Sequence, residues 1–298
     1  MQQGKYTMFM RLHPFVNVVY FLGMMVFTML YMDPLLLGVT GVICFFYLVY
    51  LEGIGGFKEN LTLLSFILLL GFVNPVFNHN GRTVLFRIKG IPFTLEAFFF
   101  GLVSAVMIYD MILLFRIFHM IMTSDKIIVV FSKVFPTGAL LFTMVLRFVP
   151  MYKLQIQRMH AARIGIGQSG NEKKKLQKIR NGVELISGLF TWSLENALET
   201  ADSMKGRGFG LKGRTFYLRT KLTRADISVL IWEVVCVAGM VYGAVNRAYH
   251  VVYYPVFQWN KGGMADAAGY VFFTAFAGIP LLLDGKEEVT WKCLRQKI

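Results

Sequence analysis

Residues 15–51 read FVNVVYFLGMMVFTMLYMDPLLLGVTGVICFFYLVYL, and this stretch decides the fold. It consists of two apolar runs, 15–32 and 34–51, that meet at Asp33-Pro34. A helix rises ~1.5 Å per residue, so each run is long enough, or nearly so, to cross a hydrocarbon core of ~30 Å. A polar residue followed by proline favours a turn and the start of a new helix. The stretch therefore predicts a tight hairpin of two membrane-spanning helices.

The rest of the chain has the same apolar character. Hydrophobic residues make up 56% of the 298 residues, including 28 Phe and 17 Met, which leaves too little polar surface for a soluble globule. The further predicted spans are the apolar blocks 61–77, 94–121, 226–249 and 265–283. The predicted fold class is therefore all-α: a polytopic helical membrane protein with about six spanning helices and a cytoplasmic amphipathic helical region.

The sequence divides into three predicted parts. Residues 1–135 hold spanning helices 1 to 4, residues 136–225 form the cytoplasmic amphipathic region, and residues 226–298 hold the C-terminal spans and a cytoplasmic tail. With an even number of spans the basic residues of most connections fall on one side, which predicts that both termini are cytoplasmic. The connection 78–92 is also basic although it falls on the outer side, and its alternating run Thr83–Ile88 predicts a small extracellular hairpin.

The cytoplasmic amphipathic region carries most of the net charge. Residues 151–225 contain 15 of the 31 Lys and Arg residues but only five acids. Two helices are predicted here: 137–163, with an apolar first half, a kink at Pro150 and an amphipathic second half, and 183–204, which is amphipathic. The apolar stripe of the second helix comprises Val183, Ile186, Phe190, Leu194, Ala197, Leu198 and Ala201.

A short motif with a central arginine lies at the end of each of these helices. The two motifs are Ala162-Arg163-Ile164 and Gly206-Arg207-Gly208. We expect both guanidinium groups to project away from the packed faces, where an arginine can make bidentate contacts to carboxylates or carbonyls of a soluble protein. Attraction to anionic lipid is a second interpretation of the basic region. Nucleic acid is not an expected partner, because the region lacks an aromatic stacking platform.

Little in the sequence points to catalysis or to a bound cofactor. The run Gly165-x-Gly167-x-x-Gly170 matches the dinucleotide fingerprint only formally, because a basic helix precedes it and lysines follow, so a flexible loop is favoured. The histidines and cysteines are scattered, and we expect no metal site and no catalytic residue. Asp110 and Arg116 lie six residues apart in the fourth span, so each needs a partner on another helix. A clasp between helices is favoured for them over a proton or ion relay.

Several segments besides the arginine motifs resemble parts of one known family. They are Leu12-His13-Pro14, Asn74-Pro75-Val76-Phe77 with Thr94-Leu95-Glu96-Ala97, Leu146-Arg147-Phe148-Val149-Pro150, and residues 201–209. Together with the motifs they cover about residues 12–210. The combined pattern resembles the transmembrane T component of energy-coupling factor (ECF) transporters, a family related to cobalt-transport permeases.

The resemblance implies a function and a set of partners. In that family the T component joins two ABC-type ATPase subunits, which bind ATP and Mg, to a membrane-embedded S component that captures a vitamin or metal ion. The T component is not an enzyme, and it lies in the plasma membrane of a prokaryote. By position, residues 136–225 would be the coupling region of this family, and Arg163 and Arg207 would each dock into one ATPase. The family usually has Ala-Arg-Gly or a small-residue variant, from which Ile164 and Gly206 depart. A self-contained secondary transporter or channel is the alternative, although no internal repeat is clear.

Overall fold

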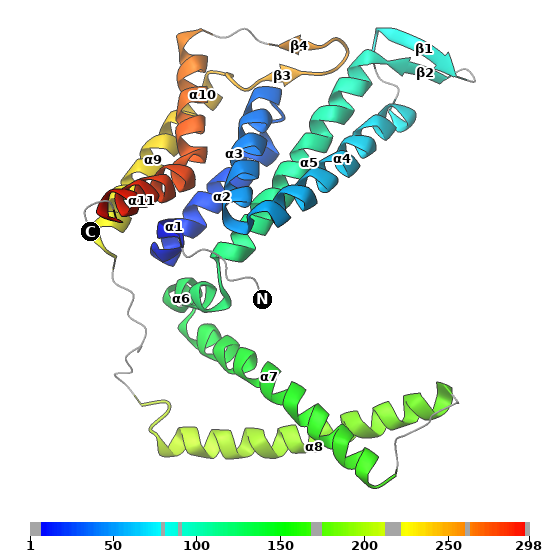
Figure 1. Ribbon diagram of the computed structural model, residues 1–298, viewed down its shortest axis with the longest axis vertical. Helices are drawn as coiled ribbons and strands as arrows, with labels where there is room; N and C mark the ends of the chain where they lie inside the picture. The colour runs from blue at the N-terminus through cyan, green and yellow to red at the C-terminus, as the bar shows by residue number, and fades with distance from the viewer. Residues whose placement is uncertain are drawn as a thin grey trace. The chain divides into compact units, whose positions relative to one another are not determined.

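The computed structural model describes residues 7–78, 81–88, 91–167, 175–211, 222–259 and 263–295. Helices dominate these residues (Figure 1), which confirms the predicted all-α membrane fold. The helices are α1 (Met8–Arg11), α2 (Pro14–Leu30), α3 (Pro34–Glu52), α4 (Ile54–Phe77), α5 (Leu95–Ile121), α6 (Ser124–Val134), α7 (Pro136–Gly165), α8 (Lys175–Gly206), α9 (Arg224–Val245), α10 (Met264–Ala277) and α11 (Ile279–Arg295). The strands are β1 (Val84–Ile88), β2 (Ile91–Thr94), β3 (Val251–Val252) and β4 (Gln258–Trp259).

The chain folds into two compact units. Residues 1–127 and 220–298 form the first, which we call the membrane unit. Residues 128–219 form the second, which we call the arm unit and which contains α7 and α8. The arm unit is an insertion between α5 and α9, so the membrane unit is assembled from both ends of the chain.

Several helices are long and apolar enough to span a membrane. Within the described part of the chain, five pass this test: α3, α4 over Gly55–Pro75, α5, α7 and α9. The pair α10 and α11 counts as a sixth span if its two bent halves are taken together. The protein is thus a multi-pass membrane protein, as the apolar blocks predict, although α7 is not one of the six blocks predicted to span.

Two predicted spans differ from the helices that form. The block 265–283 is not one straight helix, because the chain bends by 52° between α10 and α11. Gly278 is the C-cap of α10, and Pro280 lies in the first turn of α11, where its missing N–H leaves no hydrogen bond unmade. The block 15–32 corresponds to α2, whose 17 residues reach only about 26 Å.

Glycines bring the helices of the membrane unit close together. On α4 and α5, a Cβ added to Gly101 would lie 2.5 Å from the carbonyl oxygen of Gly71, so the two backbones touch directly. On α9 and α10, a Cβ added to Gly243 would lie 3.0 Å from the Cα of Gly269. Small residues at such crossings are typical of membrane helices, whose association depends on van der Waals packing rather than on the hydrophobic effect.

Polar contacts tie the two ends of the chain together. Asp284 on α11 accepts hydrogen bonds from the backbone N–H of Phe9 and from the hydroxyl of Tyr47, both at 2.9 Å. Asp226, at the start of α9, accepts from the backbone N–H of His13 at 2.9 Å. These carboxylates satisfy N–H groups at the beginnings of α1 and α2 that have no partner within their own helices.

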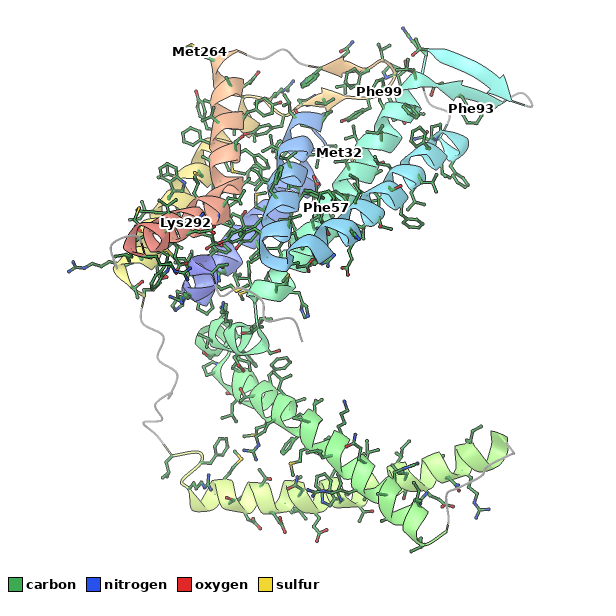
Figure 2. All side chains as sticks on the ribbon, in the orientation of Figure 1. Met32, Phe57, Phe93, Phe99, Met264 and Lys292 are labelled. Atoms are coloured by element: carbon green, nitrogen blue, oxygen red, sulfur yellow. The ribbon has the colours of Figure 1, made fainter. Side chains whose placement is uncertain are left out.

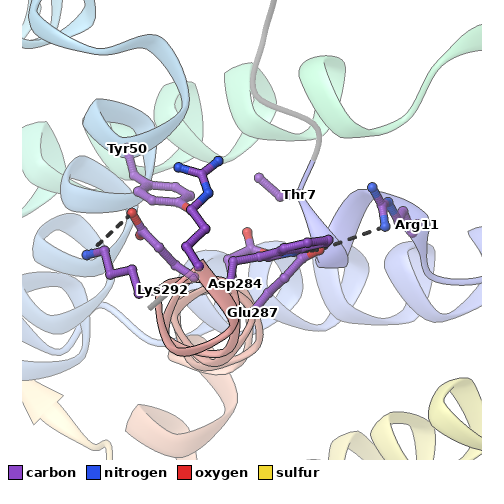
Figure 3. Close-up of a pocket in the computed structure, with 9 residues that line it drawn as sticks. Thr7, Arg11, Tyr50, Asp284, Glu287 and Lys292 are labelled. Carbon is purple, nitrogen blue, oxygen red and sulfur yellow. Dashed lines mark hydrogen bonds and ion pairs between the residues drawn. The ribbon is translucent and has the colours of Figure 1, made fainter. Parts of the chain in front are cut away.

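A pocket of about 460 Å³ lies beside these contacts (Figure 3). Its lining mixes both signs of charge. Arg11 pairs with Glu287, and Lys292 pairs with Glu288, each at an N–O distance of 3.8 Å. Because its charges are matched within the lining, the pocket does not favour a ligand of either charge.

The predicted hairpin near residue 83 is present. β1 and β2 pair in antiparallel fashion, and residues 89–90 of the connection lie outside the described residues, as do residues 79–80. Glu96, in the first turn of α5, accepts hydrogen bonds from the hydroxyl of Thr83 at 2.5 Å and from its backbone N–H at 3.2 Å. The buried carboxylate therefore fixes the base of the hairpin to the start of α5.

A second hairpin, β3 with β4, was not expected from the sequence. Its strands are two residues each, too short to show any alternation. Tyr253 donates its hydroxyl hydrogen to the carbonyl of Met32, and Phe257 stacks on Phe99 with ring centroids 5.8 Å apart. Met32 and Phe99 both lie next to this hairpin (Figure 2). The hairpin thus joins the α2–α3 connection to the beginning of α5.

The predicted clasp forms around Arg116 but not around Asp110. Arg116 donates from Nε and Nη2 to the two carboxylate oxygens of Glu52, at 2.9 and 2.7 Å. It also contacts Glu59 at 2.5 Å and the Asn60 side-chain oxygen at 3.1 Å. One guanidinium therefore joins α3, α4 and α5. Asp110 is fully buried and accepts no hydrogen bond from the described residues.

Candidate functional site

The arm unit contains both arginine motifs, on two long helices. α7 runs through Pro150 without a break and agrees with the predicted helix 137–163 to within two residues at either end. α8 begins at Lys175, eight residues before the predicted start at 183. The prediction was wrong there because it followed the apolar stripe, whereas residues 175–182 are mostly polar residues that still favour a helix. Lys173 and Lys174 lie outside the described residues.

α7 and α8 cross and pack along one face each. Tyr152 on α7 contacts Trp192 on α8 edge-on, with ring centroids 5.7 Å apart. Gly188 leaves room for the Met159 side chain, whose terminal methyl would lie 3.6 Å from a Cβ at that position. Seven half-buried positions of α7 recur every three or four residues, as a helix–helix contact requires. They are Leu140, Met144, Phe148, Tyr152, Gln155, Met159 and Arg163.

Arg163 lies on this packed face, which corrects the prediction that its guanidinium projects outward. Its Nη1 donates to the backbone carbonyl of Asn181 at 2.9 Å, and its Nη2 lies 3.3 Å from Glu184 Oε2. Arg180 contacts the other oxygen of Glu184 at 3.2 Å. The side chain of Arg163 is 21% exposed. The reason is geometric: Arg163 occupies the last turn of α7 and continues the face that meets α8. Its neighbours Ala162 and Ile164 are exposed.

Arg207 differs, because it lies beyond the last helical residue. The N–H of Phe209 donates to the carbonyl of Met204 at 3.0 Å, and the N–H of Gly208 donates to Lys205 at 2.9 Å. These two bonds form a Schellman motif, in which Arg207 is the C-cap and Gly208 takes the left-handed conformation, with φ +76°. Gly206 is the last residue of α8, as the sequence predicts.

The guanidinium of Arg207 is exposed, as predicted. Among the residues that the structure describes, no acid lies within ion-pair distance of it. Arg207 also lines a groove of about 790 Å³ between the first half of α7 and the end of α8. The apolar part of the lining comprises Leu140, Met144, Phe148, Met204, Phe209 and Leu211.

Arg147 is a groove residue that reasoning from sequence did not single out. It lines the same groove as Arg207, and its guanidinium carbon lies 5.8 Å from the ring centroid of Phe148. Glu199 is the acid in this lining. The sequence spacing could have indicated this residue, because Arg147 lies one turn after Met144 on the face of α7 that approaches α8.

The apolar stripe of α8 faces away from α7. Its five large side chains are 53% to 69% exposed, and its two alanines are exposed as well. These seven residues are the predicted stripe: Val183, Ile186, Phe190, Leu194, Ala197, Leu198 and Ala201. A contiguous apolar face of this kind on a helix marks a surface for a protein or a membrane.

The glycine-rich run after α7 has the geometry of a helix end. Gly165 is the last residue of α7, and Gly167 takes φ +75°, with its N–H donating to the carbonyl of Ile164 at 3.0 Å. Gly170 lies outside the described residues. A dinucleotide fingerprint requires a strand before the glycines, and here a helix precedes them. No three His, Cys, Asp or Glu side chains in the described ranges are close enough to hold a metal ion.

No protein-family model matches the chain, and no curated protein matches it. The candidate site therefore rests on the geometry of the arm unit alone. Three features define it: the exposed Arg207 at the end of α8, the adjacent groove, and the apolar stripe.

Proposed function

We propose that this protein is the transmembrane coupling subunit of an ATP-driven importer of the ECF type, which takes up a vitamin or a metal ion. The observation that carries the proposal is the position of Arg207. It caps a long amphipathic helix, remains exposed, and has small neighbours, Gly206 and Gly208, that allow close approach of another protein. Its planar guanidinium suits bidentate contact with a carboxylate or with backbone carbonyls in a groove.

The two arginines have different roles in this proposal. Arg207 docks directly into an ABC-type ATPase subunit. Arg163 is already engaged by α8, so the end of α7 would contact the second ATPase through its exposed neighbours Ala162 and Ile164, or through Arg163 once it leaves Glu184. ATP and Mg are bound by the ATPases and not by this chain.

In this proposal the apolar stripe of α8 connects the motion of the ATPases to the S component. When the ATPases close on ATP, they move the docked ends of the helices, and α8 transmits the motion. Its stripe packs on the membrane-embedded S component that captures the substrate. A helix that is polar on one face and apolar on the other suits a position between a soluble partner and a membrane-embedded one.

The proposal includes a location and an orientation. The chain lies in the plasma membrane of a prokaryote, with both termini in the cytoplasm. The basic residues of the arm unit support this side, because cytoplasmic connections are enriched in Lys and Arg.

Co-purification with the ATPases tests the proposal. The chain is co-expressed with two ABC-type ATPases from its own organism, chosen by their nucleotide-binding motifs, and the complex is captured through a tag on one ATPase. We expect Arg207→Glu to abolish capture of this chain. Lys205→Glu is the matched control, because it makes the same change of charge two residues earlier on the exposed end of α8. Equal capture of both variants would refute the role of Arg207.

Liposome uptake tests the alternative of a self-contained secondary transporter or channel. The buried carboxyl groups of Asp110 and Glu233 are the observation that favours it, since acids inside spanning helices often belong to transport pathways. The purified chain alone, without ATP, should give no uptake above empty liposomes. Uptake driven by a proton or ion gradient in these liposomes would support the alternative.

A further inference from the structure

Buried acids in the membrane unit fall into two groups. Most have hydrogen-bond donors, either at the first turn of their own helix or, for Asp284 in the second turn of α11, from α1 and α3. Two lie in the middle of spanning helices, where every nearby backbone N–H already donates a hydrogen bond within its own helix. The acids that are less than 9% exposed are Asp33, Glu96, Asp110, Asp226, Glu233, Asp266 and Asp284.

Four of these acids, Asp33, Glu96, Asp226 and Asp284, accept hydrogen bonds. Asp33 caps α3 through the N–H of Leu35 at 2.8 Å and accepts from the hydroxyl of Tyr270 at 2.5 Å. Asp226 forms a capping box with Thr223. Glu96 and Asp284 accept the bonds described above. Each of these carboxylates is therefore hydrogen-bonded to N–H or O–H groups.

Asp110, in the middle of α5, has no such donors. It is 0% exposed, and neither of its oxygens has a hydrogen-bond partner among the described residues. It packs against α3 so tightly that a Cβ added to Gly41 would lie 2.8 Å from Oδ1. The polar groups that face it are the thiol of Cys44 and the hydroxyl of Tyr109, and neither carries a positive charge.

Glu233, in the middle of α9, is in the same situation. It is 0% exposed, and both of its oxygens lack a hydrogen-bond partner in the described part of the chain. The polar groups close to it are Tyr20 on α2 and Cys236 on α9. The hydroxyl of Tyr20 already donates to the carbonyl of Ala277 at 2.9 Å, so it cannot donate to Glu233 at the same time.

Among the described residues, no cation forms an ion pair with either carboxyl group. α2, α3 and α10 contain no Lys or Arg, and Lys58 on α4 is exposed. On α5 itself, Arg116 is occupied by Glu52 and Glu59, and His119 is exposed. On α9, the exposed Arg224 lies nine residues before Glu233, which is about 13.5 Å along a helix.

We propose that Asp110 and Glu233 are proton-binding sites of the membrane unit, each occupied by a proton and held in the membrane as a neutral carboxylic acid. An ionised carboxylate with no partner in this environment is strongly disfavoured, and binding a proton is the way in which such a group removes its charge. The inference concerns the membrane unit alone and does not depend on which proteins dock to the arm unit.

Reaction with dicyclohexylcarbodiimide tests the proposal, because this apolar reagent partitions into membranes and consumes the protonated form of a carboxyl group. The acid O–H adds across a C=N bond of the reagent: the proton goes to nitrogen, and the carboxyl oxygen bonds to the central carbon. Transfer of the acyl group from oxygen to nitrogen then gives a stable N-acylurea. No oxidant or reductant takes part. The full-length chain is treated in native membranes at neutral pH, and its peptides are mapped by mass spectrometry.

We expect adducts on Asp110 and Glu233. We expect none on Asp33, Glu96 and Asp226, which are 0% to 3% exposed and serve as buried controls. Asp110→Asn should lose the first adduct and keep the second, and Glu233→Gln should do the reverse. Both substitutions retain a neutral polar group of the same shape, so both variants should purify as the parent does.

Infrared absorption provides a second readout that does not depend on access of the reagent. The purified protein should show the C=O stretch of protonated carboxylic acids, and each single variant should remove part of it. If neither the adducts nor the infrared band is found, the proposal is overturned. Adducts of equal yield on the control carboxylates would overturn it as well.

Discussion

The guanidinium of Arg163 donates to the backbone carbonyl of Asn181 across the crossing of α7 and α8, with Nη1 and the oxygen 2.9 Å apart. A residue that looks like a docking group in sequence is thus part of the structure that holds two helices together. Arg207, with the same kind of motif around it, is a helix cap that faces outward. The arm unit therefore offers one exposed arginine and one engaged arginine, and the two should respond differently to substitution.

Replacement of Arg163 should loosen the crossing of α7 and α8. Arg163→Ala removes a charged donor to the Asn181 carbonyl and a partner of Glu184, and we expect a loss of about 1–2 kcal/mol in the stability of this contact. Hydrogen exchange at the amides of residues 179–190 in the full-length chain should become faster. Arg180→Ala is the control, since it removes only an exposed contact within α8 to the same carboxylate. Unchanged exchange in Arg163→Ala would contradict the positioning role.

The two glycines around Arg207 should respond with opposite signs. Gly208→Ala places a Cβ on a residue with φ +76°, where it would lie 3.0 Å from Leu211 Cδ1, and we expect a cost of about 1–2 kcal/mol at the end of α8. Gly206 is helical and has open space around it, so Gly206→Ala should stabilise the helix by about 0.5–1 kcal/mol. Hydrogen exchange in the last turn of α8 distinguishes the two effects. A shift in the same direction for both variants would argue against the Schellman end.

Substitution on the exposed stripe should affect assembly and leave the chain itself intact. Phe190 is 65% exposed, so Phe190→Ser removes little packing within the arm unit. We expect thermal unfolding of the isolated chain to remain unchanged and capture of the S component to fall. Trp192→Ala is the contrasting variant: it removes the contact with Tyr152 and should destabilise the crossing by about 1–2 kcal/mol. The stripe would lose its proposed role if Phe190→Ser assembled fully.

The contact between α4 and α5 should not tolerate a methyl group. In Gly101→Ala the new Cβ would lie 2.5 Å from the Gly71 carbonyl oxygen, so the backbones must separate, at a cost of about 1–3 kcal/mol. Cys44 and Cys236 are buried, and their reaction with a thiol dye during heating reports unfolding of the membrane unit.

Two changes make this measurement specific. The exposed Cys293 is first replaced by Ser to remove its signal. Gly38→Ala serves as the control, because a Cβ on Gly38 meets nothing within 4 Å. We expect Gly101→Ala to expose the thiols at a lower temperature and Gly38→Ala to behave like the parent. Equal behaviour of the two variants would contradict the close approach of α4 and α5.

Much of this architecture follows from patterns within single segments. Apolar blocks locate the spanning helices, the alternation in Thr83–Ile88 locates β1, and the stripe of α8 follows from its period of 3.6 residues. The bend between α10 and α11 could also have been predicted, because Gly278-Ile279-Pro280 combines a helix stop with a helix start.

What the sequence leaves open depends on contacts between segments. The partner of Arg163 is a backbone carbonyl 18 residues further along the chain, and its availability depends on how α7 crosses α8. Arg116 and Asp110 occupy the same helix, yet only Arg116 meets residues of opposite charge, which α3 and α4 supply. No local pattern distinguishes the engaged residue from the isolated one.

The hydrogen bonds from Phe9 to Asp284 and from His13 to Asp226 have a consequence for biosynthesis. The ribosome makes α1 and α2 first, but their acceptors appear only after the whole arm unit has been translated. During that interval the first N–H groups of α1 and α2 lack these carboxylate acceptors. A nascent chain released before α9 would leave them in this state, and such truncated products should be prime targets for membrane quality-control proteases.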